Sequence, residues 1–131
     1  MNNSILIGKL IYERLSSNPE LKEYVNNKIF PLIAEQETTF PYIAFSKDSI
    51  TPSYTKGGNY EDTVSVQIIV ASTDYLESLN IANIVRHIFE CRLYSCDELQ
   101  ITESRLSSVS EAYDDNANAF IQRLIFNFKI S

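Results

Sequence analysis

Few side chains in this sequence could do acid–base or nucleophilic chemistry. There is one histidine, His87, and there are two cysteines, Cys91 and Cys96. His87 and Cys91 lie four positions apart, which places them on one face of a helix, a turn from each other. Neither a third orienting group nor a glycine-rich oxyanion turn accompanies this pair, and an activated nucleophile needs such a setting. The spacing therefore predicts a helix-surface histidine rather than half of a catalytic pair.

The two cysteines do not form a recognisable metal or redox motif. Cys91 and Cys96 are five positions apart, which is not the C-x-x-C spacing of zinc and thiol–disulfide sites. With a single histidine the chain also offers few soft ligands. We expect two free thiols at the end of a helix, in a reducing cytoplasm, and a disulfide between them is the alternative.

Carboxylates cluster at three places, and hydrolases use such clusters when they project into a cleft. The clusters are Glu61–Asp62, Asp97–Glu98 and Glu111 to Asp115. All three fall at predicted strand ends and turns, where Asp is favoured because it bonds to nearby backbone. We expect solvated turns. The alternative is a hard-cation site at Asp114, Asp115 and Asn116, although the D-x-D-x-D-G order of a calcium loop is missing.

Glycine content and charge exclude further functions. The only glycines are Gly8, Gly57 and Gly58, so a phosphate-binding loop cannot be built. The net charge of −6 argues against nucleic-acid binding, which depends on clustered Lys and Arg. No apolar run approaches the roughly 20 residues that span a membrane, and no secretion signal is evident. The sequence thus predicts no catalytic residue, no metal and no cofactor site, and favours binding and assembly over catalysis.

The length of 131 residues suits a single domain, residues 1–131. Helical spacing of apolar residues predicts a first helix over Ser4 to Leu15. Ser17 or Asn18 is expected to cap a second, short helix that starts at Pro19 and ends between Tyr24 and Asn27. Two short extended pieces follow, Ile29 to Leu32 and Tyr42 to Phe45, each marked by a proline.

The middle of the chain carries the clearest strand and the longest helix. Glu61 to Ala71 alternates, with Val64, Val66, Ile68 and Val70 on one face. A helix is predicted from Asp74 to Cys91, with Asp74 and Glu77 as a capping box. Its expected apolar stripe comprises Leu76, Leu79, Ala82, Ile84, Val85, Ile88 and Phe89.

The last third of the sequence indicates a hairpin. One strand spans Leu99 to Val109, with a bend or bulge expected over Glu103–Arg105, and the turn falls at Asp114–Asn116. The second strand, Ala119 to Ile130, alternates, with one polar residue, Gln122, in its apolar series. The order of elements predicts an α+β fold with a mainly antiparallel sheet and helices packed on one face.

One segment is interpreted as a contact element. Thr51 to Asn59 has turn-forming composition throughout, and a loop of that length exceeds an ordinary hairpin turn. Long ordered loops tend to be functional, and an exposed tyrosine suits an interface. The residues expected to contact a partner or another copy are Tyr54, Thr55, Lys56, Gly57 and Gly58.

The order of several short motifs resembles the tail completion, or tail terminator, proteins of long-tailed bacteriophages. The likeness covers roughly residues 5 to 90, and its most specific part is Phe40–Phe45 followed by the strand Val64–Val70. Ile69 and Ala71 depart from the acidic and aromatic residues that members often carry there. The other motifs are Ile11–Leu15, Ile29–Pro31 and the helix with Ala82, Ile84–Arg86 and Ile88.

This resemblance implies a small α+β domain without catalytic residues. Its members form a ring, often of six copies, on the head-proximal end of a tail tube. The partners implied are other copies of the chain, the tail tube protein and a head–tail connector protein. The protein would be assembled in the bacterial cytoplasm and end in the virion tail. The alternatives are a connector protein of the same virion, a small metal-dependent hydrolase and a bacterial ligand-binding domain.

Overall fold

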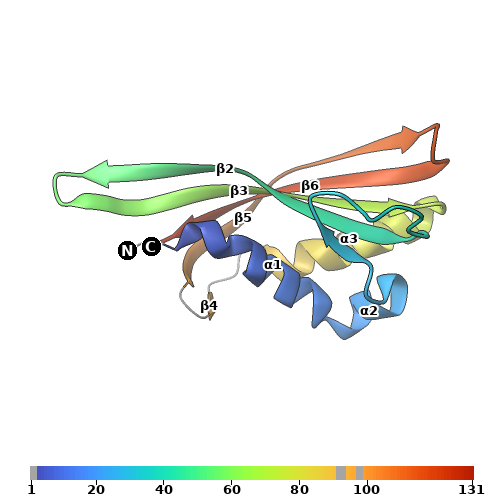
Figure 1. Ribbon diagram of the computed structural model, residues 1–131, viewed down its shortest axis with the longest axis horizontal. Helices are drawn as coiled ribbons and strands as arrows, with labels where there is room; N and C mark the ends of the chain where they lie inside the picture. The colour runs from blue at the N-terminus through green and yellow to red at the C-terminus, as the bar shows by residue number, and fades with distance from the viewer. Residues whose placement is uncertain (1–2, 91–93, 97–98) are drawn as a thin grey trace.

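A computed structural model describes residues 3–90, 94–96 and 99–131 as one six-stranded sheet with three α-helices on one face (Figure 1). The predicted α+β class, with its mainly antiparallel sheet and helices on one side, is confirmed. In chain order the elements are η1 (Ser4–Leu6), α1 (Ile7–Ser16), α2 (Pro19–Val25), β1 (Ile29–Pro31), β2 (Tyr42–Thr55), β3 (Gly58–Ser72), α3 (Tyr75–Phe89), β4 (Tyr94–Cys96), β5 (Leu99–Asp114) and β6 (Ala119–Ile130).

The sheet has the strand order β1-β2-β3-β6-β5-β4, so short strands flank four long ones. The first strand, β1, runs parallel to β2 and pairs with it over three positions, Ile43 to Phe45. The other neighbours are antiparallel. The register of β5 against β6 shifts between Ile101 and Glu103 and again between Leu106 and Ser108. The bend or bulge predicted over Glu103–Arg105 is therefore misplaced, because these three residues pair regularly and the irregularities lie on either side of them.

The starts of α2 and α3 are fixed by side-chain caps. Asn18 Oδ1 accepts a hydrogen bond from the Leu21 backbone N–H at 2.9 Å. Asp74 caps α3 by accepting from the Leu76 N–H at 3.3 Å. The predicted capping box at α3 is wrong, because Glu77 accepts a 2.6 Å bond from the Ser72 hydroxyl instead of reaching back to Asp74.

The buried face of α3 also differs from the predicted stripe. Ser78, Ala82 and the apolar residues Ile81, Val85 and Phe89 are buried, and Ile84 and Ile88 are partly buried. Leu76 and Leu79 are exposed, at 66% and 37% of their surface. At 100° per residue these two leucines lie on a different side of the helix from the buried set, so they do not reach the sheet.

The core fills the space between the three helices and one face of the sheet. Val64, Val66, Ile68 and Val70 are buried there as predicted, together with alternate residues of β6. Phe89 of α3 packs edge-on against Phe126 and Phe128, with ring centroids 5.6 and 6.0 Å apart. The opposite face of the sheet carries no helix in the described part of the chain (Figure 1).

Candidate functional site

The only histidine lies on the exposed side of α3, as predicted. His87 lines a recess of about 290 Å³ with Asn18, Glu20 and Asn83. A hydrogen bond from Arg86 lowers the pKa of the neighbouring Glu90 carboxyl, and the charges of Arg86 and His87 act in the same direction. Cys91, the other half of the pair considered above, lies outside the described residues.

The acidic clusters are dispersed over the molecule. Asp114 Oδ1 accepts from the backbone N–H groups of Asn116 and Ala117 at 3.0 and 3.3 Å, so the Asp114 end of the third cluster is a local turn as predicted. Asp97 and Glu98 lie outside the described residues. Within residues 3–90, 94–96 and 99–131, no three His, Cys, Asp or Glu side chains group closely enough to hold a metal ion.

Three of the acidic positions, Glu61, Asp62 and Glu111, lie within strands and not at the predicted strand ends and turns. Asp62 lies within β3, is 6% exposed, and accepts a 2.6 Å hydrogen bond from the Ser4 hydroxyl. Glu111 lies within β5. Both strands continue further than the sequence pattern indicated, which places these carboxylates along a ladder instead of at its end.

Glu111 belongs to a polar network that joins α3 to the last two strands. The Tyr75 hydroxyl donates to the two oxygens of Glu111 at 3.2 and 3.1 Å. Gln122 Nε2 donates to Glu111 at 2.9 Å and to Ser78 Oγ at 3.3 Å. The hydrogen bond to Glu111 and the charge of that carboxylate raise the pKa of Tyr75. This network was not predicted, and the one signal for it in the sequence is Gln122 among the inward-facing residues of β6.

The predicted loop Thr51 to Asn59 is wrong, because β2 and β3 run through it as a ladder. Thr55 pairs with Gly58, which leaves only Lys56 and Gly57 as a two-residue turn. Gly58 has a φ of +114°, a conformation that glycine adopts without a steric penalty. We call residues 51–60 the β2–β3 arm, and it projects beyond the ends of the helices (Figure 1).

The arm exposes the residues that were predicted to make contacts. Tyr54 is 71% exposed, and Thr55, Lys56, Gly57 and Gly58 at the tip are exposed as well. A register shift between Ser53 and Tyr54 alters the ladder just before the tip. A two-stranded ribbon without a packed face has little stability of its own in water. Core packing therefore does not account for the length of these strands.

The described part of the chain thus defines a class of protein: a helix-backed sheet with a projecting arm, in which no three His, Cys, Asp or Glu side chains group as a metal site. None of its helices is long and apolar enough to cross a membrane. The family described as Tail completion protein gp17 matches residues 9–130. This match is longer than the resemblance seen in the sequence, which covered roughly residues 5 to 90, and it includes the C-terminal hairpin. The chain belongs to this family, and it is a structural protein of the phage-tail type.

A solved structure gives the same fold. A chain in the structure entitled "Virion of native gene transfer agent (GTA) particle" superposes with a TM-score of 0.80 at 11% sequence identity. The alignment covers 92% of this chain and 90% of that chain, so the likeness includes both layers of the fold. No curated protein sequence matches the chain.

Proposed function

We propose that this protein is a tail terminator, which forms a ring on the end of a tail tube, stops its growth and joins it to the filled head. The observation that carries the proposal is the family match over residues 9–130. The similar chain found in a gene transfer agent virion supports a role within a particle. The partners would be further copies of the chain, the tail tube protein and a head–tail connector protein.

The β2–β3 arm is the part of the molecule that we assign to contacts with these partners. Its tip residues, Tyr54 to Gly58, are exposed on an extension that the core does not stabilise. Tyrosine combines a large apolar surface with a hydroxyl group, a combination that is enriched at interfaces. A neighbouring copy or the tube would order the arm and bury Tyr54.

We also propose that the protein has no catalytic activity. The acidic turn at Asp114 is occupied by bonds to its own backbone, and His87 lies on a helix surface. Elemental analysis of the purified protein should find no stoichiometric transition metal. A bound metal ion, or a hydrolytic activity lost on changing Asp114→Asn, would favour a small metal-dependent hydrolase instead.

The deciding experiment deletes the gene from the phage or prophage that encodes it and images the particles by electron microscopy. We expect unjoined heads and tails of uncontrolled length, and rescue of both defects by the wild-type gene supplied in trans. Tails of normal length joined to heads would refute the proposal. Heads that leak DNA beside free tails of normal length would instead identify a head-side connector protein.

Rescue with arm variants tests the assigned contact element in the same system. Tyr54→Ala should fail to rescue joining although the protein folds, because Tyr54 makes no buried contact in the isolated chain. The control is Lys22→Ala, which truncates an exposed side chain of α2, outside the arm. Full rescue by Tyr54→Ala would show that the arm tip is dispensable.

A further inference from the structure

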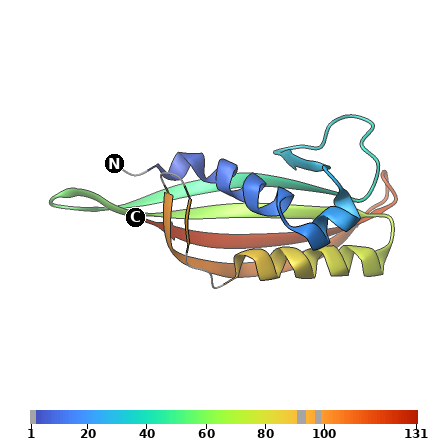
Figure 2. The ribbon, with the colours of Figure 1, turned by 90° about the horizontal axis from the view of Figure 1, so that it is seen from below.

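Large exposed apolar side chains gather at the two edges of the sheet. Eleven such side chains occur among the described residues, and ten of them fall into two groups. The first group, the β1 edge surface, comprises Ile5, Leu6, Tyr12, Leu32 and Ile33. The second, the β5 edge surface, comprises Tyr75, Leu76, Leu79, Val109 and Tyr113. Figure 2 shows α1 and β1 along one edge of the sheet, and α3 and β5 along the other.

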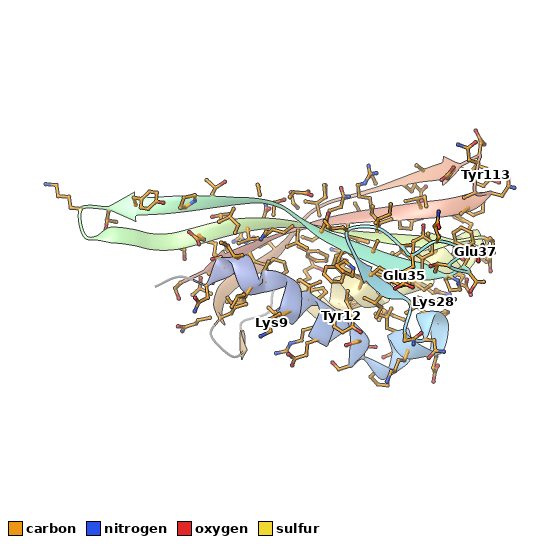
Figure 3. All side chains as sticks on the ribbon, in the orientation of Figure 1. Lys9, Tyr12, Lys28, Glu35, Glu37 and Tyr113 are labelled. Carbon is orange, nitrogen blue, oxygen red and sulfur yellow. The ribbon has the colours of Figure 1, made fainter. Side chains whose placement is uncertain are left out.

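The β1 edge surface surrounds an apolar groove. Ile5 and Leu32 line this groove together with Pro31 and Phe45, and its volume is about 140 Å³. Figure 3 shows Tyr12 on α1. Its ring lies 6.4 Å from that of Phe45, which links α1 to the same patch. Leu32 and Ile33 are 75% and 79% exposed. Clusters of this kind on a folded protein mark interaction sites more often than scattered single residues do.

The backbone at Leu32 strengthens this interpretation. Leu32 has a φ of +67°, a region that residues with a branched side chain seldom occupy. Its N–H donates to the Phe45 carbonyl at 2.7 Å, which holds the chain in this conformation. The fold therefore maintains a costly local geometry that leaves a leucine in solvent, as interaction sites do.

The β5 edge surface is built by α3 and the hairpin of β5 and β6. Tyr75 and Tyr113 both pack on Phe120, with ring centroids 5.4 and 5.0 Å apart. Leu76 and Leu79 continue the patch along the outward side of α3, which is anchored to β5 through Glu111. The patch is therefore preorganised before any partner arrives.

The two surfaces differ in charge: the β5 edge surface is acidic, whereas cations outnumber carboxylates around the β1 edge surface. Residues 73–80 and 107–118, which carry the β5 edge surface, contain Asp74, Glu77, Glu111, Asp114 and Asp115 and no Lys or Arg. Residues 3–12 and 28–33, which carry most of the β1 edge surface, contain Lys9 and Lys28 and no carboxylate. Lys47 adds a third cation beside the groove, where its Nζ donates to the Ile5 carbonyl at 3.3 Å. Glu13 and Glu35 flank this region.

Each edge also has a strand with an open ladder. Only Ile43 to Phe45 of β2 are paired with β1, and only Leu99 to Ile101 of β5 are paired with β4. Among the described residues, no strand flanks the remainder of either outer edge. Such edges present unpaired N–H and carbonyl groups to another chain.

We propose that the β1 edge surface of one copy docks on the β5 edge surface of the next, so that copies join head to tail. The two surfaces differ in residues and charge and lie on opposite edges, so each copy has one of each to offer. A contact between unlike surfaces can repeat from copy to copy and forms a ring when the rotation between copies closes, whereas a contact between identical surfaces ends at a dimer. This inference rests on the ring proposed above and specifies which residues would meet in it.

Two charge-introducing variants test the proposal by sedimentation velocity. Leu32→Asp disrupts only the β1 edge surface, and Leu79→Asp disrupts only the β5 edge surface. Each should weaken self-association by at least about 30-fold, the loss expected for a hot-spot residue. Mixed together, the two variants should form a one-to-one heterodimer, because one intact pair of surfaces remains between them. Lys22→Asp, on the exposed side of α2, is the control and should associate like wild type.

Covalent trapping in purified tails covers the case in which free protein stays monomeric. Ile33→Cys and Leu79→Cys in one chain, with Cys91→Ser and Cys96→Ser, should give a ladder of cross-linked oligomers on oxidation. Either single-cysteine chain should give none. Circular dichroism melts of each variant verify that it is folded.

The possible failures are distinguishable. Rings that survive both Asp substitutions, or tails that give no ladder, would overturn the assigned surfaces and leave the ring intact. Variants that each dimerise alone but do not pair with each other would show a contact between identical surfaces. Wild-type protein with no contact between copies, in solution or on tails, would overturn the ring itself.

Discussion

Two neighbouring isoleucines of β3 test whether one face of the sheet carries the stability of the fold. Ile68 is fully buried beneath the helices, and its register partners are Phe45 and Leu124. Ile69 points to the opposite, helix-free face and is only partly buried. Changing each to alanine applies the same chemical perturbation at adjacent positions of one strand.

The expected losses follow from what each side chain contacts. Truncating isoleucine to alanine removes three carbon atoms, which at about 0.8 kcal/mol each amounts to about 2.4 kcal/mol of transfer free energy. At Ile68 a cavity term adds to this loss, so the cost should be about 3–4 kcal/mol. At Ile69 solvent already covers part of the side chain and no closed cavity forms, so about 1 kcal/mol is expected.

Urea denaturation followed by circular dichroism measures both values, provided that the protein is monomeric at the concentration used. The slope of the unfolding free energy against urea concentration should be the same in both variants as in the wild type, so that the transition midpoints report stability directly. Equal losses at the two positions would refute the one-sided core. A larger loss at Ile69 would mean that the helix-free face is covered in the folded protein.

Three further predictions concern single contacts. Asn18→Ala should lower the unfolding free energy by about 1 kcal/mol through loss of the α2 cap, measured in the same urea assay. Ser4→Ala removes a hydrogen bond to the buried Asp62 carboxylate and should cost about 1.5–3 kcal/mol, seen as a lower urea midpoint. Tyr75 has a raised pKa in the folded protein, so its contribution to stability is fully present below its unfolded-state pKa of ~10. That contribution is lost as the pH rises through the pKa of Tyr75 in the folded protein. Glu111→Gln should bring that pKa down, which the difference in phenolate absorbance between the two proteins measures.

The parts of the fold that could be predicted from the sequence are those in which one face is buried and the other is not. Val64 to Val70 and the end of β6 alternate because the helices cover only one side of the sheet. The buried residues of α1 follow helical spacing for the same reason, and they are Ile7, Leu10, Ile11 and Leu15. These patterns also sufficed to predict the fold class.

The errors on α3 arose because apolar residues were assumed to be buried. Leu76 and Leu79 fit a broad apolar stripe by composition, but the helix contacts the sheet through a narrower face that includes Ser78. A sequence pattern cannot separate a leucine selected for the core from one selected for an interface, because both are apolar. The corrected positions now form part of the β5 edge surface.

The β2–β3 arm shows a second limit of prediction from sequence, because its strands lack the pattern by which strands are predicted. Strand prediction depends on alternation, and alternation arises only where one face of a strand is buried. Beyond Ile50 the exposed strand β2 has solvent on both faces, so it carries Thr, Pro, Ser and Tyr in no alternating order. This composition predicts a loop although the structure has a strand. Folding of the isolated chain does not select these residues. Disagreement between local sequence and observed structure is expected where function, rather than stability, determines the residues. The strand ends that could not be predicted are therefore the places to look for contacts with other proteins of the particle.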